Sequence, residues 1–565
     1  MAIAIGALAA FGAVPRFDFV DWDDGLHVYK NPGVAAPSVA AIARFWRAPY
    51  EYLYMPVTYT AWAALSPVAR LPRPDARGTT LNPAVFHTAN LVTHALSALI
   101  LFHVLLVLLW VEARREGREP VSRGPPDART VAAAGFGALV FAVHPLQAEA
   151  VAWVTGFKDV LSALFGLAAL FHLLVYAARQ RGGVSRVAFA AESGIPRALL
   201  FQRVAMHYGA SLVLLALALL SKPAAVALPF MAAALVALMP SMSLRREIRY
   251  VGPWLVLAAP VALLARHIQG PTTQVVVPLA ARPVIAGDAI AFYLAKLIAP
   301  SRLSPIYDHA PSVALARPHV AWIATLPLLL GAVLAYFGWR RRSPYIHLYA
   351  AFIAALVPVL GFVPFLYQQY STVADHYAYL AMAAAGAAAA FATAAAMRLA
   401  QTAIVVTVTV MLIASACVVA NVQASRWRTS VVLLDYALST RPANSPGNAK
   451  IYFNLGNVKM REGKLPEAVE LFHRSIALDP SLARVRNNLG TIYAQQGDLT
   501  GATREFAEAV RLDSTFAEAH NNLGQALAIQ GRMAEAIVHF RRAVALAPTL
   551  ADARANLDEA LREAK

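Results

Sequence analysis

Cysteine, charged residues and nucleotide-binding motifs are all scarce in this chain. Its 565 residues include one cysteine, Cys417, which excludes a disulfide framework, a cysteine-rich zinc site and c-type haem attachment. Charged residues make up 14% of the chain and hydrophobic residues 59%, a composition too apolar for a soluble protein. We find no glycine-rich phosphate-binding loop and no soluble α/β pattern, so a water-soluble nucleotide has no evident binding site.

Positive charge exceeds negative charge, with 49 Lys and Arg against 32 Asp and Glu and a net charge of +17. In so apolar a chain, this surplus is typical of cytoplasmic loops and not of a nucleic-acid surface. We therefore expect a membrane protein with no nucleic-acid partner.

The apolar segments predict eleven membrane spans and an all-α polytopic bundle over residues 1–421. The first is short, and its true start could lie upstream. The expected spans are residues 1–14, 84–111, 131–147, one that begins after Asp159, two short ones that meet at residues 221–223, 251–267, 319–338, 345–366, 373–397 and 402–421.

The basic loops between these spans agree with one orientation, provided that residues 16–82 and 268–318 both form extracytoplasmic loops. The N-terminus is then inside and everything after Asn421 is outside. We expect a multi-pass protein of a bacterial-type inner or plasma membrane.

An acidic cluster follows the first apolar segment. Asp21, Asp23 and Asp24 lie within four residues, with Trp22 between them. One interpretation is a catalytic carboxylate pair that faces a membrane-embedded substrate. The other is a solvated loop, because Asp is common in turns. On the predicted topology the cluster shares the outer face with residues 144–158, Lys222 and residues 368–377, and such convergence of ionisable groups indicates a functional site unless the alignment is chance.

The C-terminal region repeats every 34 residues. Glycines recur at Gly463, Gly497 and Gly531, and phenylalanines at Phe472, Phe506 and Phe540. This period is that of tetratricopeptide repeats, so residues 447–565 are expected to form three repeats and a capping helix, joined to the bundle by a linker at 422–446.

An asparagine column keeps the same period, at Asn454, Asn488, Asn522 and Asn556. These side chains could hydrogen-bond an extended acceptor peptide on the concave face. Equally, they could satisfy polar groups on neighbouring helices.

Several sequence blocks of the membrane half form a recognisable series: WDD and KNP (22–24, 30–32), HTANLVTH (87–94), FAVHPLQAEAVAWVTGFKD (141–159), LLSKP (219–223), LSPIYDH (303–309) and STVADHYAYL (371–380). In these blocks the chain resembles the transmembrane and tetratricopeptide repeat O-mannosyltransferase-like family, which has the C-type membrane glycosyltransferase fold. The resemblance covers nearly the whole chain, with two departures: Phe157 stands where Arg is expected, and His376 where Arg is commoner.

The resemblance implies transfer of a monosaccharide, such as the hexose mannose, from a polyprenyl-phosphate carrier to a hydroxyl group, expected on Ser or Thr of extracytoplasmic proteins. A carboxylate must accept the acceptor's proton, and Asp23 or Asp24 fits. Cations must stabilise the leaving phosphate, and the candidates in falling order are Lys222, His376, His144 and Lys158. Further substrate-binding candidates are His94, Glu149, Asp375 and Tyr377.

We expect no metal, because the spacing of Asp and His matches no dedicated metal motif, and no cofactor other than the lipid-linked sugar as co-substrate. The repeats would recruit the protein acceptor. The alternative is a non-enzymatic, membrane-anchored tetratricopeptide scaffold for envelope assembly, and a third hypothesis is a flippase or ligase for lipid-linked sugars. Buried ionisable groups in the spans favour the enzyme over the scaffold.

Overall fold

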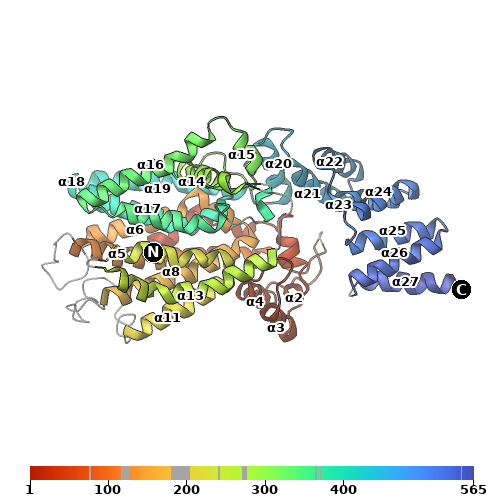
Figure 1. Cartoon of the computed structure of the whole chain (residues 1–565), viewed down its shortest axis with the longest axis horizontal. Coiled ribbons are helices and arrows are strands. Elements are labelled where there is room, and N and C mark those ends of the chain that lie inside the picture. Colours follow the sequence, from red (N-terminus) through yellow and green to blue (C-terminus); the bar gives the residue numbers. More distant parts are fainter. Residues whose placement is uncertain are drawn as a thin grey trace. The chain divides into compact units, whose positions relative to one another are not determined.

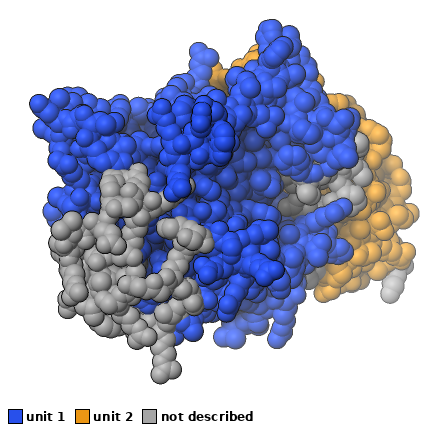
Figure 2. Space-filling model, turned by 60° about the vertical axis from the view of Figure 1, so that its left-hand side comes forward, with its two compact units in different colours: residues 1–433 blue, residues 434–565 orange. Residues whose placement is uncertain are grey.

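The computed structural model describes residues 1–75, 78–115, 127–179, 204–239, 242–269, 277–362, 366–369, 371–548 and 550–564. Within them the chain is helical, apart from three isolated β-bridges. It divides into two compact units, Met1–Leu433 and Leu434–Lys565, which are coloured separately in Figure 2. The boundary falls inside the 422–446 segment that the sequence predicts as a linker. The expectation of an all-α chain is confirmed for these residues.

Unit 1 is built from long apolar helices that pack side by side (Figure 1). Helix α8 packs against α5 and α11, α6 against α5 and α18, α14 against α16, and α12 against α17. The apolar helices of this bundle, of which α1 and α12 are short, are α1 (Ala2–Phe11), α5 (Pro83–Arg115), α6 (Ala128–Val143), α8 (Phe157–Arg179), α11 (Val204–Ser221), α12 (Leu228–Val236), α13 (Leu244–Gln269), α14 (Arg282–Ile298), α16 (Val320–Arg341), α17 (Tyr345–Leu356), α18 (Ala381–Leu399) and α19 (Thr402–Ser425).

Short helices and turns connect these long ones. Residues 16–82 contain α2 (Pro32–Ala35), α3 (Val39–Arg47) and α4 (Pro56–Leu65), together with a π-turn η2 (Gly25–Tyr29). The remaining short elements are η1 (Val14–Arg16), η3 (Pro145–Gln147), α7 (Ala148–Ala152), η4 (Val154–Gly156), η5 (Pro223–Ala227), η6 (Leu279–Ala281), α15 (Pro311–Ala316), η7 (Val357–Val359), η8 (Leu366–Gln369), η9 (Asp375–Ala378) and α20 (Ser430–Ser439).

Small residues permit the close approach of α6 and α18. A Cβ atom on Gly137 would lie 2.3 Å from the carbonyl oxygen of Gly386, and one on Gly386 would lie 2.6 Å from that of Gly137. Neither position has room for a side chain, so this crossing needs glycine on both helices.

Six helices among the described residues are long and apolar enough to cross a membrane, and the bent pair Ala128–Val143 and Pro145–Ala152 would make a seventh. Further apolar helices are shorter, at Ala2–Arg16, Ala205–Ser221, Pro223–Val236, Tyr345–Val359 and Ser430–Ser439. The count of eleven spans therefore stays a prediction, because it depends on short helices that length alone does not establish as spans.

Two prolines shape the turns that carry site residues. His144 is extended (ψ 134°) before Pro145, so α6 stops and the chain bends by 47° into the segment that holds Glu149. Lys222 is likewise extended (φ −155°, ψ 125°) before Pro223, between α11 and η5.

Unit 2 is a stack of helix pairs, with α21 (Asn448–Arg461) and α22 (Leu465–Leu478), α23 (Ala483–Gln495) and α24 (Leu499–Leu512), α25 (Ala517–Ile529) and α26 (Met533–Leu546), then α27 (Ala551–Glu563). The periodic glycines explain the repeat. Gly463, Gly497 and Gly531 have φ of +73°, +82° and +78° in the turn within each pair. Gly456, Gly490 and Gly524 lie against the rings of Phe472, Phe506 and Phe540.

Candidate functional site

Asp24 is a fully buried structural anchor. Its Oδ2 accepts a hydrogen bond from the Val20 backbone N–H (2.9 Å), and its Oδ1 accepts two from Thr155, one from the backbone N–H (3.0 Å) and one from the hydroxyl (2.6 Å). Burial raises the pKa of Asp24 to about 7, although the hydrogen bonds from Thr155 and Val20 oppose that shift. Both oxygens are occupied, so Asp24 ties the acidic segment to η4.

Asp21 also has partners for both oxygens. Its carboxylate accepts hydrogen bonds from the Tyr29 hydroxyl (3.0 Å) and the Ser430 hydroxyl (2.8 Å). Asp23 differs from both neighbours, because it is half-buried and no hydrogen bond to its carboxylate is recorded within the described residues. Its neighbour Asp24 binds Thr155, and the Thr155 carbonyl oxygen accepts a hydrogen bond from Lys158, so the acidic segment and Lys158 meet at one residue.

Two lysines bring positive charge to the same region. The Lys222 ammonium forms an ion pair with Asp159, in the first turn of α8, and lies 5.7 Å from the ring centre of Tyr377. The Lys158 ammonium donates a hydrogen bond to the Thr155 carbonyl (3.2 Å) and lies 4.4 Å from the Trp153 ring centre. The segment after α7 therefore supplies Thr155, which binds both the Asp24 carboxylate and the Lys158 ammonium.

His376 and Glu149 are joined across η9 and α7. The backbone N–H of His376 donates to Oε2 of Glu149 (2.9 Å), and its Nδ1 lies 3.0 Å from Oε1 in a geometry that makes no hydrogen bond. Burial lowers the pKa of His376 to about 3, although the charge of Asp159 opposes this shift. The ring is then neutral at pH 7, so His376 can donate a hydrogen bond to an anion but brings no charge.

Asp375 is held beside this pair, because its Oδ1 accepts a hydrogen bond from the Tyr307 hydroxyl (2.7 Å). Burial, and then the charge of Glu149, raise the pKa of Asp375 well above its usual value. We call the charged and aromatic group formed by Asp23, Asp24, Glu149, Lys158, Asp159, Lys222, His376 and Tyr377 the site cluster.

His94 and His144 have structural partners instead. The two ring nitrogens of His94 lie 2.7 Å from the Tyr379 hydroxyl and 2.9 Å from the Ala142 carbonyl oxygen. His144 contacts the Leu297 carbonyl oxygen (3.1 Å) with Nε2 and accepts the Leu146 N–H (3.2 Å) with Nδ1. With both nitrogens occupied, each ring tethers backbone segments and has no free nitrogen for a substrate.

Asp159 of the site cluster, and two residues that contact the cluster, Thr155 and Trp153, are not among the site residues predicted from the sequence. Asp159 follows Lys158 in a motif block, yet its pairing with Lys222 across 63 residues has no local signal. Thr155 and Trp153 look like ordinary helix-flanking residues, and only the fold shows that one binds Asp24 and the other lies under Lys158.

The predicted asparagine column forms hydrogen bonds between repeats. The side-chain amides of Asn488, Asn522 and Asn556 donate to Oδ1 of Asn457, Asn487 and Asn521, at 2.6, 3.0 and 2.9 Å. These amide N–H groups are thus used in stacking the solenoid, which favours the interpretation in which they satisfy neighbouring helices. The Asn454 amide nitrogen is buried without a partner in the described part of the chain.

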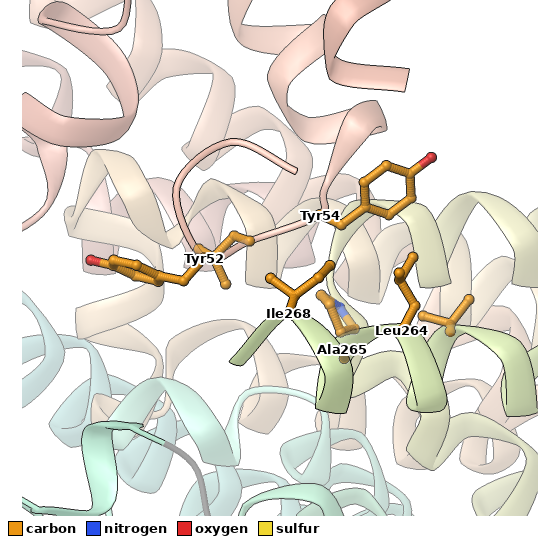
Figure 3. Close-up of a pocket in the computed structure, with 8 residues that line it drawn as sticks. Tyr52, Tyr54, Leu264, Ala265 and Ile268 are labelled. Carbon is orange, nitrogen blue, oxygen red and sulfur yellow. The ribbon is translucent and has the colours of Figure 1, made fainter. Parts of the chain in front are cut away.

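A small apolar pocket lies next to Lys222, where Pro223 and the Tyr52–Tyr54 loop meet α13. Figure 3 shows Tyr52 and Tyr54 opposite Leu264, Ala265 and Ile268 of that helix. Its volume is about 10 Å³, room for a single water, so it is a packing gap in this conformation and offers no ligand site.

Comparisons with known proteins decide the nature of unit 2. Family models described as "TPR repeat" and "Tetratricopeptide repeat" match residues 456–497 and 487–551. Residues 456–551 are tetratricopeptide repeats. Both matches fall in unit 2, so the O-mannosyltransferase-like resemblance of the membrane half stays a prediction. No curated protein matches the chain.

Several solved structures are similar to about a fifth of the chain. The first TPR of Spaghetti (RPAP3) bound to an HSP90 peptide is 22% identical, with 20% of this chain and 91% of that chain covered and a TM-score of 0.20. The second TPR domain of human RPAP3, in complex with an HSP70 peptide, is 27% identical, with 20% and 97% covered and a TM-score of 0.20. MamA is 22% identical, with 21% and 66% covered and a TM-score of 0.19.

Proposed function

We propose that this chain is a membrane glycosyltransferase that moves a hexose from a polyprenyl-phosphate carrier to a hydroxyl group of a protein acceptor. The observation that carries the proposal is the Asp23 carboxylate, which is half-buried and accepts no hydrogen bond within the described residues, next to Asp24, whose partner Thr155 also binds Lys158. A general base needs an accessible ionised oxygen, and a departing phosphate needs positive charge nearby.

Asp23 and Asp24 have different roles in the proposed reaction. Asp23 takes the acceptor's hydroxyl proton as the new glycosidic bond forms, and the bond from the sugar to the phosphate breaks with its electron pair on the phosphate. Asp24 has both oxygens bound by Val20 and Thr155, so it positions the segment and is no base. Lys222 and Lys158 stabilise the phosphate charge, and neutral His376 donates a hydrogen bond.

The surface of unit 1 supports a bilayer setting for this reaction. The apolar windows of α19 and α16 are only 6% and 17% buried, and side chains such as Trp322 (77% exposed) and Val256 (73% exposed) point outward. Apolar helices this exposed are costly in water and favourable in hydrocarbon. A lipid-linked donor would reach the site cluster by lateral diffusion.

A reconstituted assay tests the proposal. The purified chain in liposomes receives polyprenyl-phosphate mannose with a labelled sugar, and transfer to an extracytoplasmic protein fraction is counted. Asp23→Asn is expected to lower the rate by about 100-fold or more, because the proton has no acceptor. Asp21→Asn, which removes the acid two residues away, is the matched control and should retain most activity.

Parental transfer by Asp23→Asn would contradict the assignment of the base. The absence of transfer by the parental chain from several polyprenyl-phosphate hexoses would favour the scaffold function. The repeats themselves suggest a protein-interaction role under either outcome.

A further inference from the structure

Unit 2 contains a groove large enough for a peptide segment. Its volume is about 660 Å³, and helices α23 to α27 contribute its walls. The floor is apolar, with the side chains of Leu499, Phe506, Met533 and Phe540. Ile529 also lines the groove and is 69% exposed, so a large aliphatic side chain is open to a ligand there.

The rim of the groove is polar but carries amides instead of cations. Gln495, Asn522, Gln525 and Asn556 line it, and we call them the rim amides. Asn522 and Asn556 each use an amide N–H in the stacking of the repeats, which leaves their carbonyl oxygens and both ends of the Gln495 and Gln525 amides to pair with a peptide backbone. An apolar floor below an amide rim suits an extended polypeptide that places alternate side chains inward.

The charge of the groove is negative. Glu559 and Glu563 are the charged residues among the described groove-lining side chains, with no Lys or Arg. They are four residues apart on α27 and therefore on one face, and both are exposed. No ion pair to either carboxylate is recorded in the described part of the chain. This acidic groove belongs to a chain whose net charge is +17.

We infer that the groove binds an extended polypeptide segment in which Lys or Arg is adjacent to an apolar side chain. The apolar side chain enters the floor, the rim amides pair with the segment's backbone, and the cation meets Glu559 and Glu563. Acidic segments are repelled by the same two carboxylates. This selectivity specifies the protein acceptor that the repeats would recruit, so it rests on that part of the proposed function.

Fluorescence anisotropy tests the inference with two labelled peptides, Ser-Lys-Leu-Lys-Ser and Ser-Glu-Leu-Glu-Ser. The full chain is held in nanodiscs of zwitterionic lipid, and empty nanodiscs measure binding to the lipid alone. The lysine peptide is expected to bind the more tightly, with an affinity that falls as salt rises.

Matched variants locate the binding site. The double change Glu559→Gln and Glu563→Gln should lower the affinity for the lysine peptide by about fivefold, as expected for the loss of two partly exposed charge pairs. Glu518→Gln with Asp552→Asn removes two exposed acids outside the groove and should change the affinity by less than about twofold. Equal loss in both variants, tighter binding of the glutamate peptide, or no binding of the lysine peptide would each overturn the inference.

The same titration on Asp23→Asn separates this inference from the catalytic proposal. That variant leaves unit 2 unchanged, so it should bind the lysine peptide with parental affinity even if the chain transfers no sugar.

Discussion

Asp23 and Asp24 are adjacent in sequence, yet their surroundings differ. Asp24 is buried and its carboxylate accepts three hydrogen bonds. Asp23 is half-buried, and its carboxylate accepts no hydrogen bond within the described residues. In the sequence the two acids look equivalent. The contact that distinguishes them is the one between Asp24 and Thr155, which are 131 residues apart. No local sequence pattern around Thr155 predicts this contact. At this scale the sequence predicts the chemistry of the segment but not the division of roles.

Asp24 should make stability depend on pH. Its pKa rises from 3.8 to about 7 on folding, so the fold favours the protonated acid and its contribution is lost as pH rises between those values. The loss is at most about 4 kcal/mol for a shift of this size. We expect the thermal midpoint of the parental chain to decrease as the pH is raised from 5 to 8. The midpoint of Asp24→Asn should decrease less over the same range.

Thermal unfolding in detergent, followed by intrinsic tryptophan fluorescence at both pH values, measures the difference between the two slopes. The same slope in both proteins would show that other groups carry the pH dependence.

At the scale of elements, the Lys222–Asp159 ion pair joins the turn before η5 to the first turn of α8. Lys222→Met alone leaves the Asp159 carboxylate, 5% exposed, without its cation and should cost about 3 kcal/mol. Asp159→Leu combined with Lys222→Met removes both charges and should regain most of that stability.

Donor titration then separates structure from binding. If Lys222 holds the donor phosphate, the double variant recovers its thermal midpoint while its apparent KM for the lipid-linked sugar stays raised. Lys222→Arg keeps a cation, so its apparent KM for the lipid-linked sugar should lie between that of the double variant and that of the parental chain. Recovery of both stability and donor use by the double variant would make the pair purely structural.

The asparagine column supports the stacking of unit 2. Asn488, Asn522 and Asn556 each donate one hydrogen bond to the preceding repeat, so each change to Ala should lower the free energy of unfolding by about 1 kcal/mol. Urea unfolding followed by circular dichroism measures this loss. Asn444→Ala, at an exposed position between α20 and α21, is the control. Unchanged stability in all three variants would mean that these asparagines do not stabilise the stack and would leave peptide binding as their role.

Element prediction from this sequence succeeded where local chemistry dictates structure. The 34-residue period is confirmed, because a positive-φ glycine and a glycine–phenylalanine contact recur in every helix pair. Proline sterics also explain the bend at Pro145, although the sequence predicts a span through it, at residues 131–147. Short apolar helices are different, since hydropathy does not tell a short span from a buried core helix, and the count of eleven spans consequently stays a prediction.

At the scale of the whole molecule, two units with different surfaces share one chain. Unit 1 exposes apolar helices suited to lipid, whereas unit 2 is a solenoid with a polar rim around its groove. A soluble small acceptor would need no tetratricopeptide solenoid to recruit it. The combination therefore favours a protein acceptor, captured by one unit and modified by the other.

Removal of the solenoid tests this division of labour. A stop after Asn444 falls between α20 and α21, so it keeps α20 whole and deletes all seven helices from α21 to α27. Without tethering, the acceptor must reach the site cluster from bulk solution, and its apparent KM should rise by about tenfold or more. Hydrolysis of the lipid-linked donor by water needs no tethered protein and should keep its parental rate, which also reports that unit 1 remains folded. Transfer to proteins with an unchanged KM would mean that the repeats bind something other than the acceptor, and the scaffold role of unit 2 would take precedence.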